Sequence, residues 1–260
     1  MKRAKRIRNY VFRKLHSGQS CYCLYCGKSY GRFLHAGVKS DVFKKYKVAG
    51  GGYKKNVSCP NCGSVARQRL LALFFKLRTD VFHKTTDILH VSPNASLVHY
   101  LNQHDTVKQV IGAYEPEQFP EFSCMVMDIQ KINLENNLFD VVICCHVLEH
   151  VDQAEQAMRE IYRILKPNGF AILQTPIALN LQKTLEDKTI TSQSARKKAY
   201  GQVDHVRLFG LDYFDKLRTA GFRVVRDNPF SNQWLNETEL SKHCLERIED
   251  VVICFKDAGS

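Results

Sequence analysis

Long apolar runs are missing from this sequence, and none reaches the roughly 18 residues that a helix needs to cross a bilayer. The first residues are basic and no apolar segment follows them, so we expect no secretory signal peptide. These absences predict a soluble, cytoplasmic protein. Ten cysteines in such a chain are expected as thiols or metal ligands, because disulfide frameworks belong to oxidising compartments. With 260 residues, 44% of them hydrophobic, the chain can form one large domain and a small appendage.

Acidic side chains are nearly absent from the first quarter of the chain. Residues 1–60 contain 15 lysines and arginines and one acid, Asp41, which gives a net charge of +14. Residues 61–260 contain 23 basic and 25 acidic side chains, which gives −2. Attraction to an anionic partner is therefore a property of residues 1–60 alone. Nucleic acid, the anionic inner face of a membrane and an acidic substrate all fit this charge, and so does a solvated tail without a specific partner.

Four of the cysteines form two Cys-x-x-Cys-Gly units that are separated by 32 residues. Each turn can aim two thiolates at one metal ion, and its glycine lets backbone amides approach the sulfurs. Two such turns complete a tetrahedral site with no open position, which is typical of a structural Zn²⁺ ion. The predicted ligands are Cys23, Cys26, Cys59 and Cys62.

We therefore predict three parts: a basic tail at residues 1–18, a zinc ribbon at 19–65 and a larger domain at 66–260. The basic and aromatic residues between the two cysteine units could grip single-stranded nucleic acid. A solvated ribbon is the simpler interpretation, because so small a module needs its few aromatic side chains for packing.

The segment from residue 140 to 173 predicts a strand, a turn, a helix, a second turn and a second strand. Residues 140–145 are apolar after the first and rich in β-branched side chains, as in a parallel strand that is covered on both faces. The sequence Lys166-Pro167-Asn168-Gly169 ends the helix before the next strand. The apolar residues of the helix follow helical spacing at Ala154, Ala157, Met158, Ile161 and Leu165. This pattern predicts half of a doubly wound, mostly parallel α/β sheet.

The same segment, with FDVVICCHVLEH and LKPNGF, resembles the second half of class I S-adenosylmethionine-dependent methyltransferases. The resemblance extends to CPNCGSVARQRLLALFF, ILHVSPN and GQVDHVRLFGLDYFDKLRTAGF, so it covers residues 23–255. It is similar in particular to bacterial methyltransferases of surface-polysaccharide gene clusters, which carry a zinc knuckle before this domain. The resemblance implies a seven-stranded Rossmann-like sheet and S-adenosylmethionine as cofactor. A doubly wound domain for another nucleotide is the plainer alternative.

The resemblance places cofactor contacts at the carboxyl ends of the first four strands. Residues 87–91 should form the first strand, and its turn, from His90 to Asn94, lacks the glycines that most of the family has there. Ser92 and Asn94 can offer a hydroxyl and an amide to the cofactor, although helix capping explains Asn94 equally well. We therefore count His90, Ser92 and Asn94 as cofactor candidates.

The other cofactor candidates follow the next three strands. After residues 107–112, Ala113 stands where the family places a ribose-binding carboxylate, so Glu115 is the nearest acid. Residues 124–127 end at Asp128 and Ile129, where the adenine is expected. Beyond the fourth strand, Cys145 and His146 should line the cofactor. Glu149 and His150 are expected to hold the loop or to touch the substrate.

Candidate catalytic residues follow a polar stretch, residues 184–200, which is long enough to form a lid. Methyl transfer to a hydroxyl benefits from a general base, and we predict His205 in this role or in positioning the acceptor. Asp204 could orient the imidazole, and Arg207 could fix an anionic acceptor. In the plainer interpretation these three residues anchor the following helix to the sheet.

The leading functional hypothesis is a cytoplasmic O-methyltransferase (EC 2.1.1.-) that acts on a saccharide or related intermediate of surface polysaccharide biosynthesis. The basic residues 1–60 would hold the protein near the inner membrane face. The saccharide follows only from the resemblance. One alternative is an RNA methyltransferase that binds its substrate through the zinc ribbon. Another is a cofactor-binding protein without catalysis, because the glycine turn and the ribose-binding acid are both missing.

Overall fold

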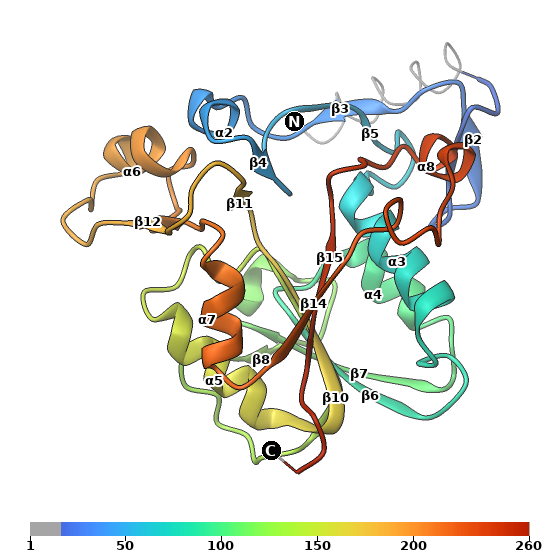
Figure 1. Ribbon diagram of the computed structural model, residues 1–260. Coiled ribbons are helices and arrows are strands. Elements are labelled where there is room, and N and C mark those ends of the chain that lie inside the picture. Colours follow the sequence, from blue (N-terminus) through green and yellow to red (C-terminus); the bar gives the residue numbers. More distant parts are fainter. Residues whose placement is uncertain (1–16, 260) are drawn as a thin grey trace.

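The computed structural model describes residues 17–259, and its centre is a seven-stranded sheet (Figure 1). The strand order is β14-β15-β10-β9-β6-β7-β8, and all neighbours are parallel except β15, which is antiparallel to both β10 and β14. This arrangement is the doubly wound, mostly parallel sheet that the sequence predicts. The strands are β6 (Thr86–Val91), β7 (Val107–Ala113), β8 (Met125–Val126), β9 (Phe139–Cys145), β10 (Leu165–Gln174), β14 (Arg223–Asp227) and β15 (Val251–Phe255).

Two helices cover each face of this sheet. Helices α3 (Ala66–Arg78) and α4 (Ala95–Leu101) lie on one face, and α5 (Ala154–Ile164) and α7 (Tyr213–Thr219) lie on the other (Figure 1). Successive residues of β9 pack on opposite sides, with Val141 and Ile143 facing α3 and α4, and Val142 and Cys144 facing α5 and α7. This alternation is why the strand is apolar throughout its length.

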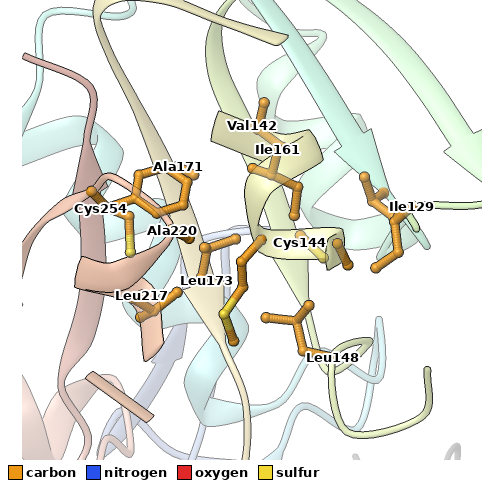
Figure 2. Packing of buried hydrophobic residues seen from close by; sticks show 14 of the residues in the cluster. Ile129, Val142, Cys144, Leu148, Ile161, Ala171, Leu173, Leu217, Ala220 and Cys254 are labelled. Atoms are coloured by element: carbon orange, nitrogen blue, oxygen red, sulfur yellow. The ribbon is translucent and has the colours of Figure 1, made fainter. Parts of the chain in front are cut away.

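The helix α5 buries the apolar stripe that its spacing predicts. Ala154, Ala157, Met158 and Ile161 are fully buried against the sheet. Figure 2 shows how side chains of this cluster from α5, α7 and the strands meet in one layer. The strand after α5 is longer than predicted, because β10 begins at Leu165 and has a register shift before Phe170.

The residues before α3 form a small module that contains two strand pairs. Strands β1 (Cys21–Cys23) and β2 (Lys28–Tyr30) form one pair, and β3 (Leu34–Ala36) and β5 (Lys54–Ser58) form the other. Helix α2 (Asp41–Lys45) and β4 (Val48–Ala49) lie between β3 and β5. We call residues 19–65 the N-terminal module. Most of the predicted basic tail, residues 1–16, lies outside the described residues.

The N-terminal module contacts the sheet domain at several places, among them β4 and Asn56. Strand β4 pairs with β11 (Ile177–Ala178), which directly follows β10, so the module lies over the carboxyl end of the sheet (Figure 1). The excursion between β14 and β15 contains α8 (Glu237–Lys242) and packs Leu235 and Leu240 against Leu73 of α3. Near the end of this excursion, Cys244 Sγ accepts a hydrogen bond from Asn56 Nδ2 of the N-terminal module at 3.6 Å.

The predicted lid contains short elements. They are β12 (Leu185–Glu186) and α6 (Gln193–Tyr200), and β12 pairs with β13 (Arg207–Leu208). A single 3₁₀ turn, η1 (Pro116–Gln118), follows β7. No helix within residues 17–259 is both long and apolar enough to cross a membrane.

Candidate functional site

A cavity of about 590 Å³ opens at the carboxyl ends of β6, β7, β8 and β9. Its volume is within the range of small-molecule sites, and its position is where open α/β sheets bind ligands. Seven of the predicted site residues line it: Ser92, Glu115, Asp128, Ile129, His146, His150 and Asp204. Tyr114, Gln118, Phe119 and Gln130 also line it, and no sequence motif indicates them. A larger groove of about 860 Å³ lies beside α3, away from these strand ends.

The glycine-free turn after β6 adopts the conformation that glycine usually supplies. Ser92 has a φ of 46°, in the left-handed region, and its N–H donates to Gly112 O at 2.9 Å. His90 is buried beneath the turn and does not line the cavity, and burial lowers its pKa to about 4. Asn94 caps α4 by accepting a hydrogen bond from Leu97 N at 3.2 Å. The structure therefore corrects His90 and Asn94 from cofactor contacts to supports of the turn.

Two carboxylates, those of Asp128 and Glu115, line the cavity. Asp128 Oδ1 accepts hydrogen bonds from Gln130 N at 2.9 Å and Gln130 Nε2 at 3.1 Å. Gln130 Oε1 accepts from Gln153 N at 2.8 Å, which ties this turn to the start of α5. Glu115 lies on the same cavity and accepts a hydrogen bond from Gln118 Nε2. Ile129 is buried beside Asp128, so an apolar surface and a carboxylate are adjacent. Such a pair suits the binding of a heterocyclic amine, whose ring is apolar and whose amino group donates hydrogen bonds.

Cys145, which ends β9, and His146, which follows it, face different surroundings. Cys145 packs against the α3 and α4 side of the sheet, and burial raises the pKa of its thiol to about 12. Cys145 does not line the cavity, so a contact of the cofactor with the backbone here would involve His146. His146 does line the cavity, with a φ of 59° and a hydrogen bond from its N–H to Gln174 O at 2.7 Å.

A buried carboxylate, Glu149, stands behind the cavity wall. Its side chain is 2% exposed, and its Oε2 accepts a hydrogen bond from Thr175 Oγ1 at 2.9 Å. The nearest nitrogens to Oε1 are His146 Nδ1 at 3.3 Å and His150 Nε2 at 3.9 Å. Burial alone would raise the pKa of Glu149, but these two imidazoles outweigh it and lower the pKa to about 2.

The predicted pairing of Asp204 with His205 is absent. Asp204 instead approaches His150, with its Oδ2 at 3.5 Å and its carbonyl oxygen at 3.2 Å from His150 Nδ1. His205 is 1% exposed, lies edge to face with His150 at 4.8 Å between ring centroids, and places Nε2 2.9 Å from Gln202 Nε2. Burial lowers the pKa of His205, so its imidazole is neutral near pH 7.

Arg207 holds the loop after β9 in place and is not free to bind an acceptor. Its buried guanidinium donates to the carbonyl oxygens of Leu148 at 2.8 Å, Val151, and Asp152 at 3.0 Å. It also donates to both carboxylate oxygens of Glu186, at 2.8 and 3.1 Å. The predicted role in fixing an anionic acceptor is therefore wrong. The plainer interpretation, a structural anchor, describes Arg207.

The four predicted metal-ligating thiols lie together in the N-terminal module. Their sulfurs are all within 4.8 Å of one another, with 3.6 Å between Cys23 and Cys62 and 3.7 Å between Cys26 and Cys59. A tetrahedron with metal–sulfur bonds of about 2.3 Å has sulfur–sulfur edges of about 3.8 Å, so the cluster fits one zinc ion. Gly27 and Gly63 both have positive φ, and each donates its N–H to a cysteine carbonyl oxygen at 2.9 Å.

Comparisons with known proteins agree with this fold. Residues 76–173 match the sequence model of the family described as “Methyltransferase domain”. A 63-residue stretch is 36% identical to the ubiquinone biosynthesis O-methyltransferase of Rickettsia canadensis, and covers 24% of this chain and 26% of that protein. A 67-residue stretch is 45% identical to the enzyme of the same name from Rickettsia felis, and covers 26% of this chain and 27% of that protein. The chain thus spans about a quarter of the length of these curated relatives.

Among solved structures, the [4+2]-cyclase SpnF superposes with a TM-score of 0.50 at 17% identity, over 73% of this chain and 76% of that one. This likeness concerns the fold alone, and its name shows that the fold does not determine the reaction. Together with the strand order, these findings define the fold as that of class I S-adenosylmethionine-dependent methyltransferases.

Proposed function

We propose that the protein is an S-adenosylmethionine-dependent O-methyltransferase that acts on a saccharide or a related intermediate of surface polysaccharide biosynthesis. The observation that carries the reaction is the cavity at the carboxyl ends of the strands, which meets the buried Glu149–His150–His205 cluster at His150. The curated relatives are named as O-methyltransferases, which supports an oxygen acceptor. The saccharide rests on the sequence resemblance.

The cavity offers suitable partners for each part of the cofactor. The carboxylates of Asp128 and Glu115 can accept hydrogen bonds from an amine and from hydroxyls, and Ile129 offers an apolar surface to a ring. Ser92 and His146 line the same cavity. S-adenosylmethionine would supply a methyl group on a sulfonium, which becomes a neutral thioether when the acceptor oxygen takes the methyl carbon.

The acceptor oxygen must lose a proton as its bond to carbon forms and the carbon–sulfur bond breaks. His150 lines the cavity, and His205 lies directly behind it. We assign the handling of this proton to the cluster of His150, His205 and Glu149, rather than to His205 with Asp204 and Arg207. Asp204 then orients His150 through Nδ1, and Arg207 maintains the loop that carries both Glu149 and His150.

Titration calorimetry and a transfer assay test this proposal. S-adenosylhomocysteine should bind to the wild type, and Asp128→Asn should weaken binding about tenfold or more because a hydrogen bond to a charged acceptor is lost. His150→Ala and His205→Ala should keep cofactor affinity and lower turnover by about two to four orders of magnitude. The assay offers methyl-labelled cofactor to nucleotide sugars and to extracted polysaccharide. Absence of binding by both cofactor forms would defeat every methyltransferase hypothesis.

The positive charge of residues 1–60 favours a second candidate, an RNA methyltransferase. Lys44, Lys45 and Lys47 are exposed on and after α2, at the end of the module that faces the carboxyl edge of the sheet. Replacing all three with glutamine should lower the salt dependence of RNA binding by about three counterions. Label transferred to RNA, together with such a loss, would favour this candidate over the saccharide enzyme. The same variants measured on anionic vesicles test attachment to a membrane surface.

A further inference from the structure

The cluster beside the cavity combines side chains that commonly bind metal ions. One carboxylate oxygen of Glu149 and one nitrogen each of His150 and His205 lie within 4.8 Å of one another. They come from two segments, the loop after β9 and the segment before β13, which meet where Val206 N donates to Glu149 O at 3.0 Å. Thr175 fixes the carboxylate by donating to its Oε2. The fold therefore holds three metal-binding groups in place next to the cavity.

Two buried polar atoms of this cluster lack hydrogen bonds within the described part of the chain. They are Glu149 Oε1 and His205 Nδ1, and both side chains are almost fully buried. The polar groups nearest Oε1 are the imidazoles of His146 and His150, at 3.3 and 3.9 Å. A buried polar atom without a partner costs about 1–3 kcal/mol, so such atoms call for an explanation. A ligand between them supplies one.

Gln202 selects which nitrogen of His205 is available. The side-chain amide of Gln202 lies 2.9 Å from His205 Nε2. As placed, Gln202 Nε2 donates to His205 Nε2, which leaves the imidazole proton on Nδ1. The metal site requires a half-turn of the amide, after which its oxygen accepts the Nε2–H and the lone pair lies on Nδ1. Partners of this kind commonly orient the imidazole ligands of metal ions. Gln202 is thus a positioning residue for His205.

We propose that Glu149, His150 and His205 bind one divalent first-row metal ion. Two imidazoles and one carboxylate suit Mn²⁺, Fe²⁺, Co²⁺ or Zn²⁺, and they leave coordination positions open. His150 lines the cavity, so the open positions face the acceptor. Resting on the proposed function, the ion would coordinate the acceptor hydroxyl and lower its pKa, and the hydroxyl proton would pass to water before methyl transfer. With the ion bound, His150, His205 and Glu149 would act as ligands and not as proton acceptors. This site differs from the four-thiolate cluster, which has no open position.

Manganese binding to the full-length, zinc-loaded protein tests the site without any substrate. Mn²⁺ prefers oxygen and nitrogen ligands, so it reports on this cluster and not on the thiolates. Electron paramagnetic resonance should show about one bound Mn²⁺ per chain. Glu149→Gln and His205→Asn should each weaken binding tenfold or more. His150→Asn should do the same, and its partly exposed position makes it the variant least prone to misfold.

The control is His99→Asn, because His99 is exposed on α4 and lies outside the cluster. It should bind Mn²⁺ as the wild type does. Wild-type protein that binds no Mn²⁺, or variants that bind it equally well, would overturn the metal site. Calorimetry with S-adenosylhomocysteine on the same samples separates the two proposals. Cofactor binding without Mn²⁺ binding refutes the metal site alone, whereas Mn²⁺ binding without cofactor binding refutes the proposed function alone.

Discussion

The ring of Phe43 lies so close to Gly201 that a Cβ at position 201 would come within 2.7 Å of Phe43 Cδ1. Phe43 belongs to α2 of the N-terminal module, whereas Gly201 ends α6 with a φ of 91°. The same phenylalanine ring is 6.2 Å from the ring of His205, between centroids. The N-terminal module is therefore part of the surroundings of the candidate site, and not a separate appendage.

Gly201→Ala should lower the free energy of unfolding by about 2–4 kcal/mol. The left-handed φ accounts for about 1 kcal/mol and the overlap with Phe43 for about 1–3 kcal/mol. Phe43→Ala in the same chain should remove the second contribution, so the double variant should be more stable than the sum of the single effects predicts. Urea denaturation measures all four proteins. Strictly additive effects would contradict the packing of this pair.

Zinc removal should loosen the N-terminal module first. Cys59→Ser should abolish the binding of about one zinc per chain, because three thiolates no longer complete the tetrahedron. Hydrogen exchange should then rise in residues 19–65, and also in β11, which pairs with β4. Cys124→Ser is the control, since Cys124 lies outside the cluster and is only partly buried. Full zinc content in Cys59→Ser would refute the assignment.

Arg207→Lys should destabilise the protein by about 3–5 kcal/mol. Lysine cannot reproduce the planar fork that reaches three carbonyl oxygens and Glu186, and it leaves buried acceptors without a donor. Glu186→Gln should cost less, because the Glu186 side chain is partly exposed. Denaturation measures the loss of stability, and cofactor titration measures whether the cavity still binds its ligand. A variant with wild-type stability and no turnover would restore the role in acceptor binding.

Glu249 should make stability fall as the pH rises. Burial raises the pKa of this carboxyl to about 7, although the nearby Arg67 opposes the shift. In the unfolded chain the carboxyl ionises near its ordinary pKa of 4.5. Between these values the folded state keeps the proton that the unfolded state loses, so the free energy of unfolding falls from about pH 4.5 to 7 and stays low above it.

Glu249→Gln should therefore be more stable than the wild type above about pH 7, by at most about 3 kcal/mol, and equally stable near pH 4. Chemical denaturation across this range measures the difference. Glu121→Gln provides the control because Glu121 is exposed, and it should show no such trend. A difference between the Glu249 variant and the wild type that does not depend on pH would exclude ionisation as its cause.

Most of the sheet could be predicted from the sequence, because apolar periodicity states directly which faces are buried. The strand predicted at residues 140–145 differs from β9 by one residue. The edge strand β8 is shorter than predicted, since it pairs with β7 through only two residues. The two cysteine units could also be predicted from the sequence, because their spacing and their glycines define the turns.

Apolar periodicity and cysteine spacing were therefore enough to predict the doubly wound sheet, the four-thiolate cluster and most residues of the cavity at the strand ends. Three contacts became visible only in the folded chain: Asp204 with His150, Arg207 with the loop after β9, and Phe43 with His205. Because Asp204, His205 and Arg207 are close in sequence, they were predicted to act together. In the folded chain, however, a buried polar group pairs with the group that the fold places beside it. For Arg207 that partner is the loop after β9, more than fifty residues earlier in the chain.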